Sequence, residues 1–241
     1  MQFRAHRGHV AYPENTLLAF QKAIEDGFEI LETDPVYTKD GVIVLMHDHA
    51  INRTCRNRDG SPIEHEILVA DATYGELLAY DAGIAHGEEF RGTPIPRLEE
   101  LLELVDGSDI ILDLDKKIPT DKMDELLELI GRYNVRAEFS CGDCERIKKV
   151  LSYLPNARIN YDGKTTEEIL AEVCALVPYE QLIVWMYYDN ENFAWLTDRD
   201  KTSRENCARV KKYARLGIAN ILTTYEMRNA IRWGADAIEF F

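Results

Sequence analysis

Two histidines and an arginine stand where apolar segments of the chain end. His6 and Arg7 close the first such segment, and His47 and Asp48 close another. Imidazole is the side chain best suited to proton transfer near neutral pH. A guanidinium offers a fixed fork of donors to a phosphate. We therefore predict that His6 and His47 form an acid–base pair and that Arg7 binds an anion.

Acidic side chains recur at every second position. Glu32 and Asp34 are two residues apart, and so are Asp113 and Asp115. Alternate residues of a strand share a face, so each pair points in one direction if the strand extends that far. Crowded carboxylates repel one another unless they are protonated or bind a cation. Oxygen ligands favour Mg²⁺ or Ca²⁺, and we predict a divalent metal site, with surface salt bridges as the alternative.

These residues need a scaffold that brings strand ends together. Short apolar segments rich in Ile, Val and Leu alternate with helical patterns, as is typical of strands buried on both faces of a parallel sheet. The predicted strands are residues 2–6, 28–34, 42–47, 109–115, 135–139, 157–161, 182–187, 218–224 and 235–240. These nine strands exceed a barrel's eight by one. We expect either 182–187 or 218–224 to lie outside the barrel.

The alternation predicts an α/β fold, and the length of 241 residues favours one closed (β/α)₈ TIM barrel over residues 1–241. A doubly wound open sheet is the second choice. In such barrels the C-terminal ends of the strands build the active site. The histidines and carboxylates named above would therefore converge on one rim.

Helix caps and one long insertion complete the predicted layout. Asn15 or Thr16 caps the first helix, and Thr165 with Glu168 forms a capping box for a later one. Residues 49–96 form a long polar insertion after the third strand, with a short helical pattern near 74–80. Loops of this length in compact domains are often functional, so we expect a lid or small subdomain.

Charge and hydropathy limit the partners. The formal net charge of −15 argues against binding to nucleic acid, whose partners usually carry a basic stripe. A small phosphorylated substrate is compatible with this charge, because a bound cation reverses the local field. No run of 18 apolar residues occurs, so no transmembrane segment is expected.

The cysteines and the N-terminal sequence bear on the compartment. Five cysteines at irregular spacings predict reduced thiols rather than a disulfide framework. The first residues show no export signal, so we expect a cytoplasmic location, with a secreted protein that has lost its signal as the alternative.

The first half of the chain resembles the glycerophosphodiester phosphodiesterase family, a group of phosphatidylinositol phospholipase C-like barrels. The shared motifs are H-R-G at 6–8, P-E-N-T at 13–16, E-x-D at 32–34, T-x-D-G at 38–41 and V-x-x-H-D at 44–48. Residues 53–54 and 95–104 continue the similarity, which is strong over about the first 105 residues. The family has a TIM barrel with a segment inserted after the third strand, in agreement with the fold predicted above.

The resemblance implies hydrolysis of glycerophosphodiesters to an alcohol and glycerol 3-phosphate, assisted by Ca²⁺ or Mg²⁺. It implies Glu32 and Asp34 as metal ligands. It also implies His6 and His47 as the acid–base pair, with Arg7 on the phosphate. A hydroxyl of the substrate is expected to attack phosphorus, giving a cyclic phosphate that water then opens.

Three positions depart from the family's pattern. Its E-x-K motif corresponds here to Asp113 and Asp115. Asp113 keeps an oxygen ligand and is predicted as the third metal ligand, but Asp115 cannot supply a cation. Lys117, two residues further on, is predicted to bind the substrate instead. An asparagine of the family is replaced by Tyr225, and its closing T-D by residues 240–241.

Other functions fit parts of the same pattern. A barrel that binds a metal and an anion without turnover would explain the changes at Asp115 and Tyr225. A phospholipase D-like enzyme on lysolipids, or a metal-assisted aldolase or isomerase, is less consistent with the motifs.

Four aromatic residues are expected to pack in the core or a lid, with contact to a substrate head group as the alternative. They are Trp185, Tyr187, Tyr188 and Trp195. The sequence fixes neither the head group, the native metal nor the oligomeric state.

Overall fold

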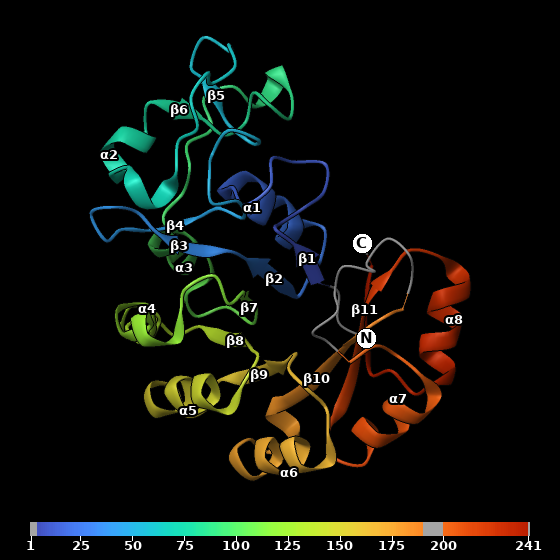
Figure 1. Cartoon of the computed structure of the whole chain (residues 1–241). Coiled ribbons are helices and arrows are strands. Elements are labelled where there is room, and N and C mark those ends of the chain that lie inside the picture. The colour runs from blue at the N-terminus through green and yellow to red at the C-terminus, as the bar shows by residue number, and fades with distance from the viewer. Residues whose placement is uncertain (1–3, 190–199, 241) are drawn as a thin grey trace. The chain divides into compact units, whose positions relative to one another are not determined.

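The computed structural model describes residues 4–189 and 200–240 and divides into two compact parts. The N-terminal part comprises residues 2–137 and the C-terminal part residues 138–241. In both parts, parallel strands alternate along the chain with helices (Figure 1).

Three parallel strands organise the N-terminal part. β1 (Arg4–His6) pairs with β2 (Ile30–Thr33), and β2 pairs with β7 (Ile111–Leu114). Every residue of β2 and β7 is buried, as expected for strands covered on both faces. Since the strands are parallel, their carboxyl ends lie at one edge of the sheet.

The helices of this part follow the predicted apolar patterns. α1 (Leu17–Glu25) begins at Thr16, whose hydroxyl accepts a hydrogen bond from the Ala19 N–H at 3.3 Å. The predicted cap at Thr16 is therefore confirmed, and Asn15 serves another purpose. α3 (Leu98–Val105) buries four residues spaced i, i+3, i+4 and i+7. Each such apolar side chain contributes roughly 1.5–3 kcal/mol when fully buried. α4 (Asp124–Ile130) follows β7.

The segment predicted as the third barrel strand lies outside the parallel sheet. β3 (Pro35–Tyr37) and β4 (Ile43–Leu45) form an antiparallel hairpin. Only residues 38–42 connect them, and a parallel pairing would need a crossover of a dozen or more residues. The prediction that 182–187 or 218–224 is peripheral was therefore wrong, because both segments lie in strands of the parallel set.

The insertion at 49–96 has an apolar cluster of its own. It contains β5 (Arg56–Asn57), α2 (Tyr74–Leu77) and β6 (Tyr80–Asp81), which lie together in Figure 1. Ile51, Leu77 and Ile95 are buried together with Val44 of β4. The short helix expected near 74–80 is confirmed. The cluster packs the insertion against the hairpin that precedes His47.

The C-terminal part continues the alternation. Its parallel strands are β8 (Arg136–Cys141), which begins in the N-terminal part, and β9 (Arg158–Tyr161), β10 (Leu182–Tyr187), β11 (Arg215–Ile221) and β12 (Ala237–Phe240), paired in that order. Its helices are α5 (Cys144–Tyr153), α6 (Glu167–Leu176), α7 (Arg204–Lys211) and α8 (Thr224–Arg232).

The cap of α6 differs by one residue from the prediction. Thr166, not Thr165, accepts the hydrogen bond from the Ile169 N–H. Thr165 instead donates both its backbone N–H and its hydroxyl to Asp200, at 2.8 and 2.6 Å. The two neighbouring threonines are equivalent in sequence, and the tertiary contact with Asp200 distinguishes them.

Three of the four singled-out aromatic residues pack against their neighbours, as expected. Trp185 lies so close to Gly217 that a Cβ there would meet its ring at 2.5 Å. Tyr187 donates to Asp162 at 3.2 Å, and the Tyr188 ring stacks on Trp233. Trp195 lies outside the described residues. All five cysteines belong to the described residues and are free thiols, as predicted.

Candidate active site

The strand register aligns three of the predicted residues in the N-terminal part. His6 lies opposite Glu32, and Glu32 lies opposite Asp113. Partners in register on parallel strands point to the same face, so these side chains form one row across β1, β2 and β7. The His6 Nε2 atom lies 3.8 Å from a carboxylate oxygen of Glu32. Asp34 and Asp115 follow directly after β2 and β7.

Arg4 contacts this row from the same face of β1, and the sequence interpretation missed it. Its guanidinium pairs with the Asp113 carboxylate at 2.7 Å, and the Asp113 side chain is only 1% exposed. A buried carboxylate needs such a partner, because an unpaired charge is costly to remove from water. The alternation of side chains along a strand could have predicted this position, since Arg4 is two residues before His6 and shares its face.

A tight turn places Arg7 over the end of β2. Arg7 has φ of 59° and Gly8 has φ of 91°, both in the left-handed region. A Cβ at Gly8 would meet the Ala19 side chain at 2.6 Å, so this position needs glycine both for its conformation and for its contact with α1. The turn directs the Arg7 N–H to the Glu32 side chain at 3.0 Å.

The Arg7 guanidinium lies between two carboxylates. Its Nη1 donates to Glu14 at 3.4 Å, and its Nε lies 3.5 Å from Asp34. The side chain is 17% exposed, so part of the guanidinium is accessible to a bound anion.

Asn15 fixes the orientation of Asp34 and was not predicted to do so. Its amide donates to Asp34 Oδ2 at 2.8 Å, and its carbonyl oxygen accepts from the Thr33 hydroxyl at 2.9 Å. Asn15 is buried and has φ of 55°, a left-handed conformation that asparagine tolerates better than most residues. The asparagine of the P-E-N-T motif thus holds a carboxylate at the end of β2.

Lys117 reaches the same edge, as predicted. Its ammonium lies 3.7 Å from Asp34 and 3.8 Å from Asp115, with 23% of the side chain exposed. Burial raises the pKa of Asp34, the hydrogen bond from Asn15 opposes that rise, and the nearby charge of Asp115 adds to it. The Lys117 ammonium in this position offsets the repulsion between the Asp34 and Asp115 carboxylates.

His47 is one of the charged groups that influence the pKa of His6. Burial is the largest cause that lowers the pKa of His6, and the charges of Arg7 and His47 add to it, so that the pKa falls to about 4. His6 is therefore neutral at pH 7.

His47 is held by the residue that follows it. Its Nδ1 lies 2.6 Å from Asp48 Oδ1. Hydrogen bonds from Arg53 lower the pKa of Asp48 to about 2, so this carboxylate is ionised and acts as an acceptor. Nδ1 of His47 must then carry the proton, and Nε2 is left for proton transfer.

The structure shows carboxylates suited to a hard cation but no assembled cluster. Glu32 and Asp34 offer buried oxygen donors from the end of one strand, which is the chemistry that Mg²⁺ and Ca²⁺ prefer. Among residues 4–189 and 200–240, no three His, Cys, Asp or Glu side chains form a group that could hold a metal ion. Asp113 is paired with Arg4 instead. Metal binding by these three carboxylates stays a prediction.

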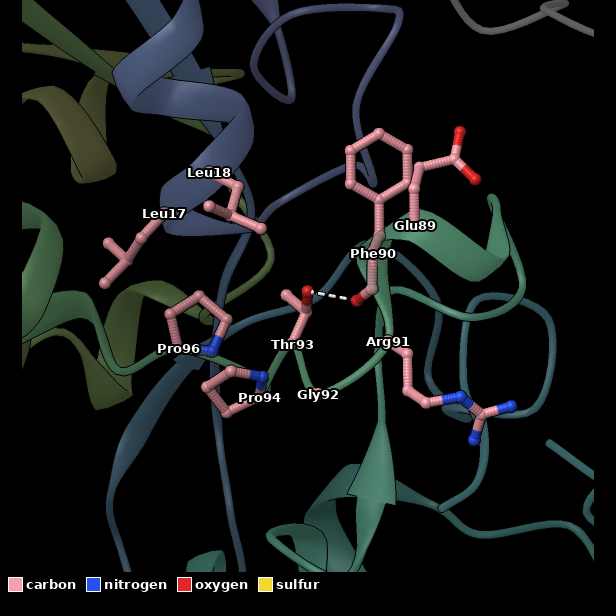
Figure 2. Close-up of a pocket in the computed structure, with 9 residues that line it drawn as sticks. All are labelled: Leu17, Leu18, Glu89, Phe90, Arg91, Gly92, Thr93, Pro94 and Pro96. Atoms are coloured by element: carbon pink, nitrogen blue, oxygen red, sulfur yellow. Dashed lines mark hydrogen bonds between the residues drawn. The ribbon is translucent and has the colours of Figure 1, made fainter. Parts of the chain in front are cut away.

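A separate hollow of about 350 Å³ lies between the start of α1 and the end of the insertion. Figure 2 shows Leu17 and Leu18 on one side, with Pro94 near them and the Thr93 hydroxyl donating to the Phe90 carbonyl. In the part of the chain that the structure describes, its lining includes none of the predicted site residues. The candidate site is therefore the charged strand ends and not this apolar hollow.

A comparison with known families decides the classification. The profile of the glycerophosphoryl diester phosphodiesterase family matches residues 6–157, more than half of the chain. The chain belongs to the glycerophosphoryl diester phosphodiesterase family. The matched range includes every predicted site residue of this family member, from His6 to Lys117.

Two named relatives agree with this family. A glycerophosphodiester phosphodiesterase of Caldanaerobacter subterraneus subsp. tengcongensis is 34% identical over 160 residues, 62% of this chain and 63% of the relative. One of Bacillus altitudinis is 45% identical over 102 residues, 42% of this chain and 38% of the relative. The matches thus span less than two thirds of the length of these relatives.

Solved structures of phosphodiesterases share the fold of the whole chain. A phosphodiesterase of Oleispira antarctica, in complex with the product sn-glycerol-3-phosphate, has a TM-score of 0.78 and 20% identity over 100% of this chain and 92% of its own. A glycerophosphodiester phosphodiesterase of Thermotoga maritima has a TM-score of 0.66 and 24% identity over 100% and 94%. The predicted (β/α)₈ barrel is confirmed.

Two further predictions can be compared with this family member's structure. None of the helices described here combines the length and apolar character needed to cross a bilayer. Tyr225, which replaces a family asparagine, is 70% exposed in the first turn of α8.

Proposed function

We propose that the protein is a metal-dependent phosphodiesterase that hydrolyses glycerophosphodiesters to an alcohol and glycerol 3-phosphate. The observation that carries this proposal is the gathering of His6 and Arg7 around buried Glu32 and Asp34, together with His47 oriented by Asp48. The names of the relatives and the product in the Oleispira antarctica complex support the choice of substrate class.

The two imidazoles supply the proton transfers that the reaction needs. Attack on phosphorus requires a base to take a proton from the attacking hydroxyl, and departure of the alcohol requires an acid. In the Nδ1–H tautomer set by Asp48, the Nε2 atom of His47 serves one of these steps. His6, at the end of β1, serves the other. Each placed acid or base typically contributes about 10²–10⁴-fold to a rate.

The cationic side chains hold the phosphate. Arg7 presents planar donors and Lys117 a compact charge, and both lie beside Asp34. The two cations neutralise the acidic edge enough for an anion to approach despite the net charge of −15. Lys117 thus supplies the cation that Asp115 cannot.

Glu32 and Asp34 would hold the divalent cation, with Asp113 as the third ligand once Arg4 releases it. When bound, the cation supplies charge stabilisation on the phosphoryl oxygens, worth several kcal/mol. The chain's own contribution is to fix Glu32 through the Arg7 N–H and Asp34 through Asn15.

Release of glycerol 3-phosphate from glycerophosphocholine tests the proposal. We expect turnover with Mg²⁺ or Ca²⁺, its loss in EDTA, and its return when metal is added back. His6→Ala and His47→Ala should each reduce kcat by about 10²–10⁴-fold. His65→Ala, an exposed histidine of the insertion, is the matched control and should leave turnover unchanged.

Two results would contradict the proposal. One is turnover that persists in EDTA and in both histidine variants. The other is tight binding of the phosphodiester, measured by calorimetry, with no product after long incubation. The second result would favour a binding protein that has lost its activity.

A further inference from the structure

Arg53 joins two residues of the site that approach from different directions. It lies in the insertion, five residues after Asp48 and far along the chain from Glu14. Its Nε donates to Asp48 Oδ2 at 2.5 Å and its Nη2 to Asp48 Oδ1 at 3.2 Å. Its Nη1 and Nη2 donate to the two oxygens of Glu14 at 2.9 and 2.7 Å. One planar guanidinium thus holds two carboxylates, each through both oxygens.

Each carboxylate in turn holds a residue of the proposed chemistry. Asp48 accepts from Nδ1 of His47 at 2.6 Å, and Glu14 accepts from Nη1 of Arg7 at 3.4 Å. The contacts form one continuous chain from His47 through Asp48, Arg53 and Glu14 to Arg7. None of the proposed metal ligands takes part in these six hydrogen bonds.

We propose that Arg53 is a positioning residue that orients His47 through Asp48 and Arg7 through Glu14. The inference rests on the proposed function, since it assigns a role toward the same histidine and arginine. It goes beyond that function because it makes a residue of the insertion necessary for the alignment of two strand-end side chains.

The geometry argues for orientation rather than for stability. The Arg53 side chain is 49% exposed, and ion pairs with that exposure contribute little to folding. Fixing the direction of a carboxylate does not depend on burial, because the planar fork sets both of its oxygens. Lysine has one ammonium and cannot hold two carboxylates through four oxygens. Arg53→Lys therefore should not replace arginine.

The pKa of Asp48 supports the part of the proposal in which Arg53 orients His47 through Asp48. The hydrogen bonds from Arg53 are the largest cause that lowers the pKa of Asp48, to about 2. An ionised Asp48 accepts a hydrogen bond and so selects the Nδ1–H tautomer of His47. An amide in place of Asp48 can donate instead and stabilise the opposite tautomer.

Kinetics of matched variants separate the effect of Arg53 on His47, through Asp48, from its effect on Arg7, through Glu14. Asp48→Asn should lower kcat by at least about 100-fold with little change in KM, because the wrong tautomer of His47 is favoured. Glu14→Gln should mainly raise KM, because Arg7 loses its second anchor. Arg53→Ala and Arg53→Lys should show both effects, with kcat lowered by about 10- to 100-fold.

Arg91 offers the matched control within the insertion. It also holds a carboxylate through two oxygens, donating to Glu88 at 2.6 and 2.9 Å, and is 41% exposed. Arg91→Ala removes a comparable exposed pair that does not lead to a histidine. We expect its kcat and KM to stay within threefold of the wild type.

Two readouts distinguish positioning from a general structural role. Guanidinium ion at a non-denaturing concentration should raise the kcat of Arg53→Ala at least threefold and leave Arg91→Ala unchanged. Nitrogen-15 NMR of labelled histidines should show the Nδ1–H tautomer of His47 in the wild type, assigned with His47→Ala. That signal should shift in Arg53→Ala and stay unchanged in Arg91→Ala.

The NMR comparison also separates this inference from the proposed function. If the wild type releases no glycerol 3-phosphate, the proposed function fails, and the His47 signal still decides the role of Arg53. If Arg53→Ala does not fold, Arg53→Lys and Asp48→Asn give the same comparison. An unchanged His47 signal in the folded Arg53 variants, or kinetics equal to those of Arg91→Ala, would overturn the inference.

Discussion

The strand ends of the two parts hold their polar groups in different ways. In the N-terminal part, carboxylates, guanidinium groups and imidazoles contact one another at the ends of β1, β2 and β4. In the C-terminal part, the ends of β9 and β10 carry Asp162 and Tyr187, and Trp185 packs against the backbone of Gly217. The first arrangement consists of ion pairs and hydrogen bonds among charged groups, and the second combines one tyrosine hydrogen bond with the packing of a ring against backbone.

The difference shows where the fold tolerates crowded charge. Buried charges are costly unless each one is paired and hydrogen-bonded. The N-terminal part meets this requirement with Arg4, Arg7 and the neutral amide of Asn15. The C-terminal part also buries an ion pair, Glu138 with Arg158, but at the first residue of β9 rather than at a strand end. Dense charge at the strand ends is thus a feature of the part that the family profile matches most fully.

The largest expected effect on stability tests whether the Asn15 amide is needed to hold Asp34 at the end of β2. Asn15→Ala removes the hydrogen bonds to Asp34 and Thr33 and places alanine at φ of 55°. We expect a loss of about 2–5 kcal/mol in the free energy of unfolding, because buried partners are left unsatisfied and the backbone is strained. Urea denaturation measures this, with the exposed Asn134→Ala as the control. A change below 0.5 kcal/mol would show that the charged end does not depend on this amide.

The next largest effect tests whether close packing of Trp185 against Gly217 stabilises the C-terminal part. Gly217→Ala would place a Cβ 2.5 Å from the Trp185 ring. We expect a loss of about 1–3 kcal/mol from overpacking, seen as a lower melting temperature. Gly75→Ala in α2, where a Cβ meets nothing within 4 Å, should be neutral or slightly stabilising. Equal melting temperatures for the two variants would show that the close packing at Gly217 does not contribute to stability.

A smaller effect concerns the hydrogen bond between Tyr187 and Asp162. Tyr187→Phe keeps the ring and removes the hydroxyl that donates at 3.2 Å. We expect a loss of about 0.5–1.5 kcal/mol, the usual net value of one such bond. Chemical denaturation of both proteins measures it. A loss above 3 kcal/mol would mean that hydrogen bonding dominates there too, and the contrast between the two parts would weaken.

The smallest effect concerns pH and the Asp48–Arg53 pair. Arg53 lowers the pKa of Asp48 from its ordinary value of 3.8 to about 2. A lowered carboxyl pKa contributes stability that is fully present above pH 3.8 and is lost as the pH falls toward 2. The stability difference between the wild type and Arg53→Gln should therefore be constant from pH 5 to 7 and shrink below pH 4, remaining under about 1 kcal/mol.

Denaturation curves at several pH values test this dependence. The difference between the wild type and Gly217→Ala should not change over the same range, because no titrating group takes part in that contact. A pH-independent effect of Arg53→Gln would show that Asp48 is not stabilised in its ionised form.

Several features of the site followed from local sequence patterns. The α/β alternation, the cap at Thr16 and the positions of His6 and Glu32 at the ends of predicted strands depend on residues close together in the chain. Lys117 was predicted to reach the site from its spacing, and the structure brings it to Asp34. Periodicity captures such features because the geometry of a strand or helix fixes which neighbours share a face.

Other features could not be derived in this way. The segment 42–47, which contains β4, was interpreted as a barrel strand, because an apolar run looks the same whether it pairs in parallel or antiparallel. Thr165 and Thr166 were indistinguishable until the contact with Asp200 was known. Asn15 was considered only as a cap, since its partner Asp34 lies on a different element.

The sequence by itself determined the family, the alternation of strands and helices, and the residue types available at the strand ends. The tertiary structure decided their pairing: Arg4 with Asp113, Asn15 with Asp34, and Arg53 with both Glu14 and Asp48. The physical reason is that strand register and chain packing set which distant charges meet. Composition and spacing specify a side chain's chemistry but not its partner.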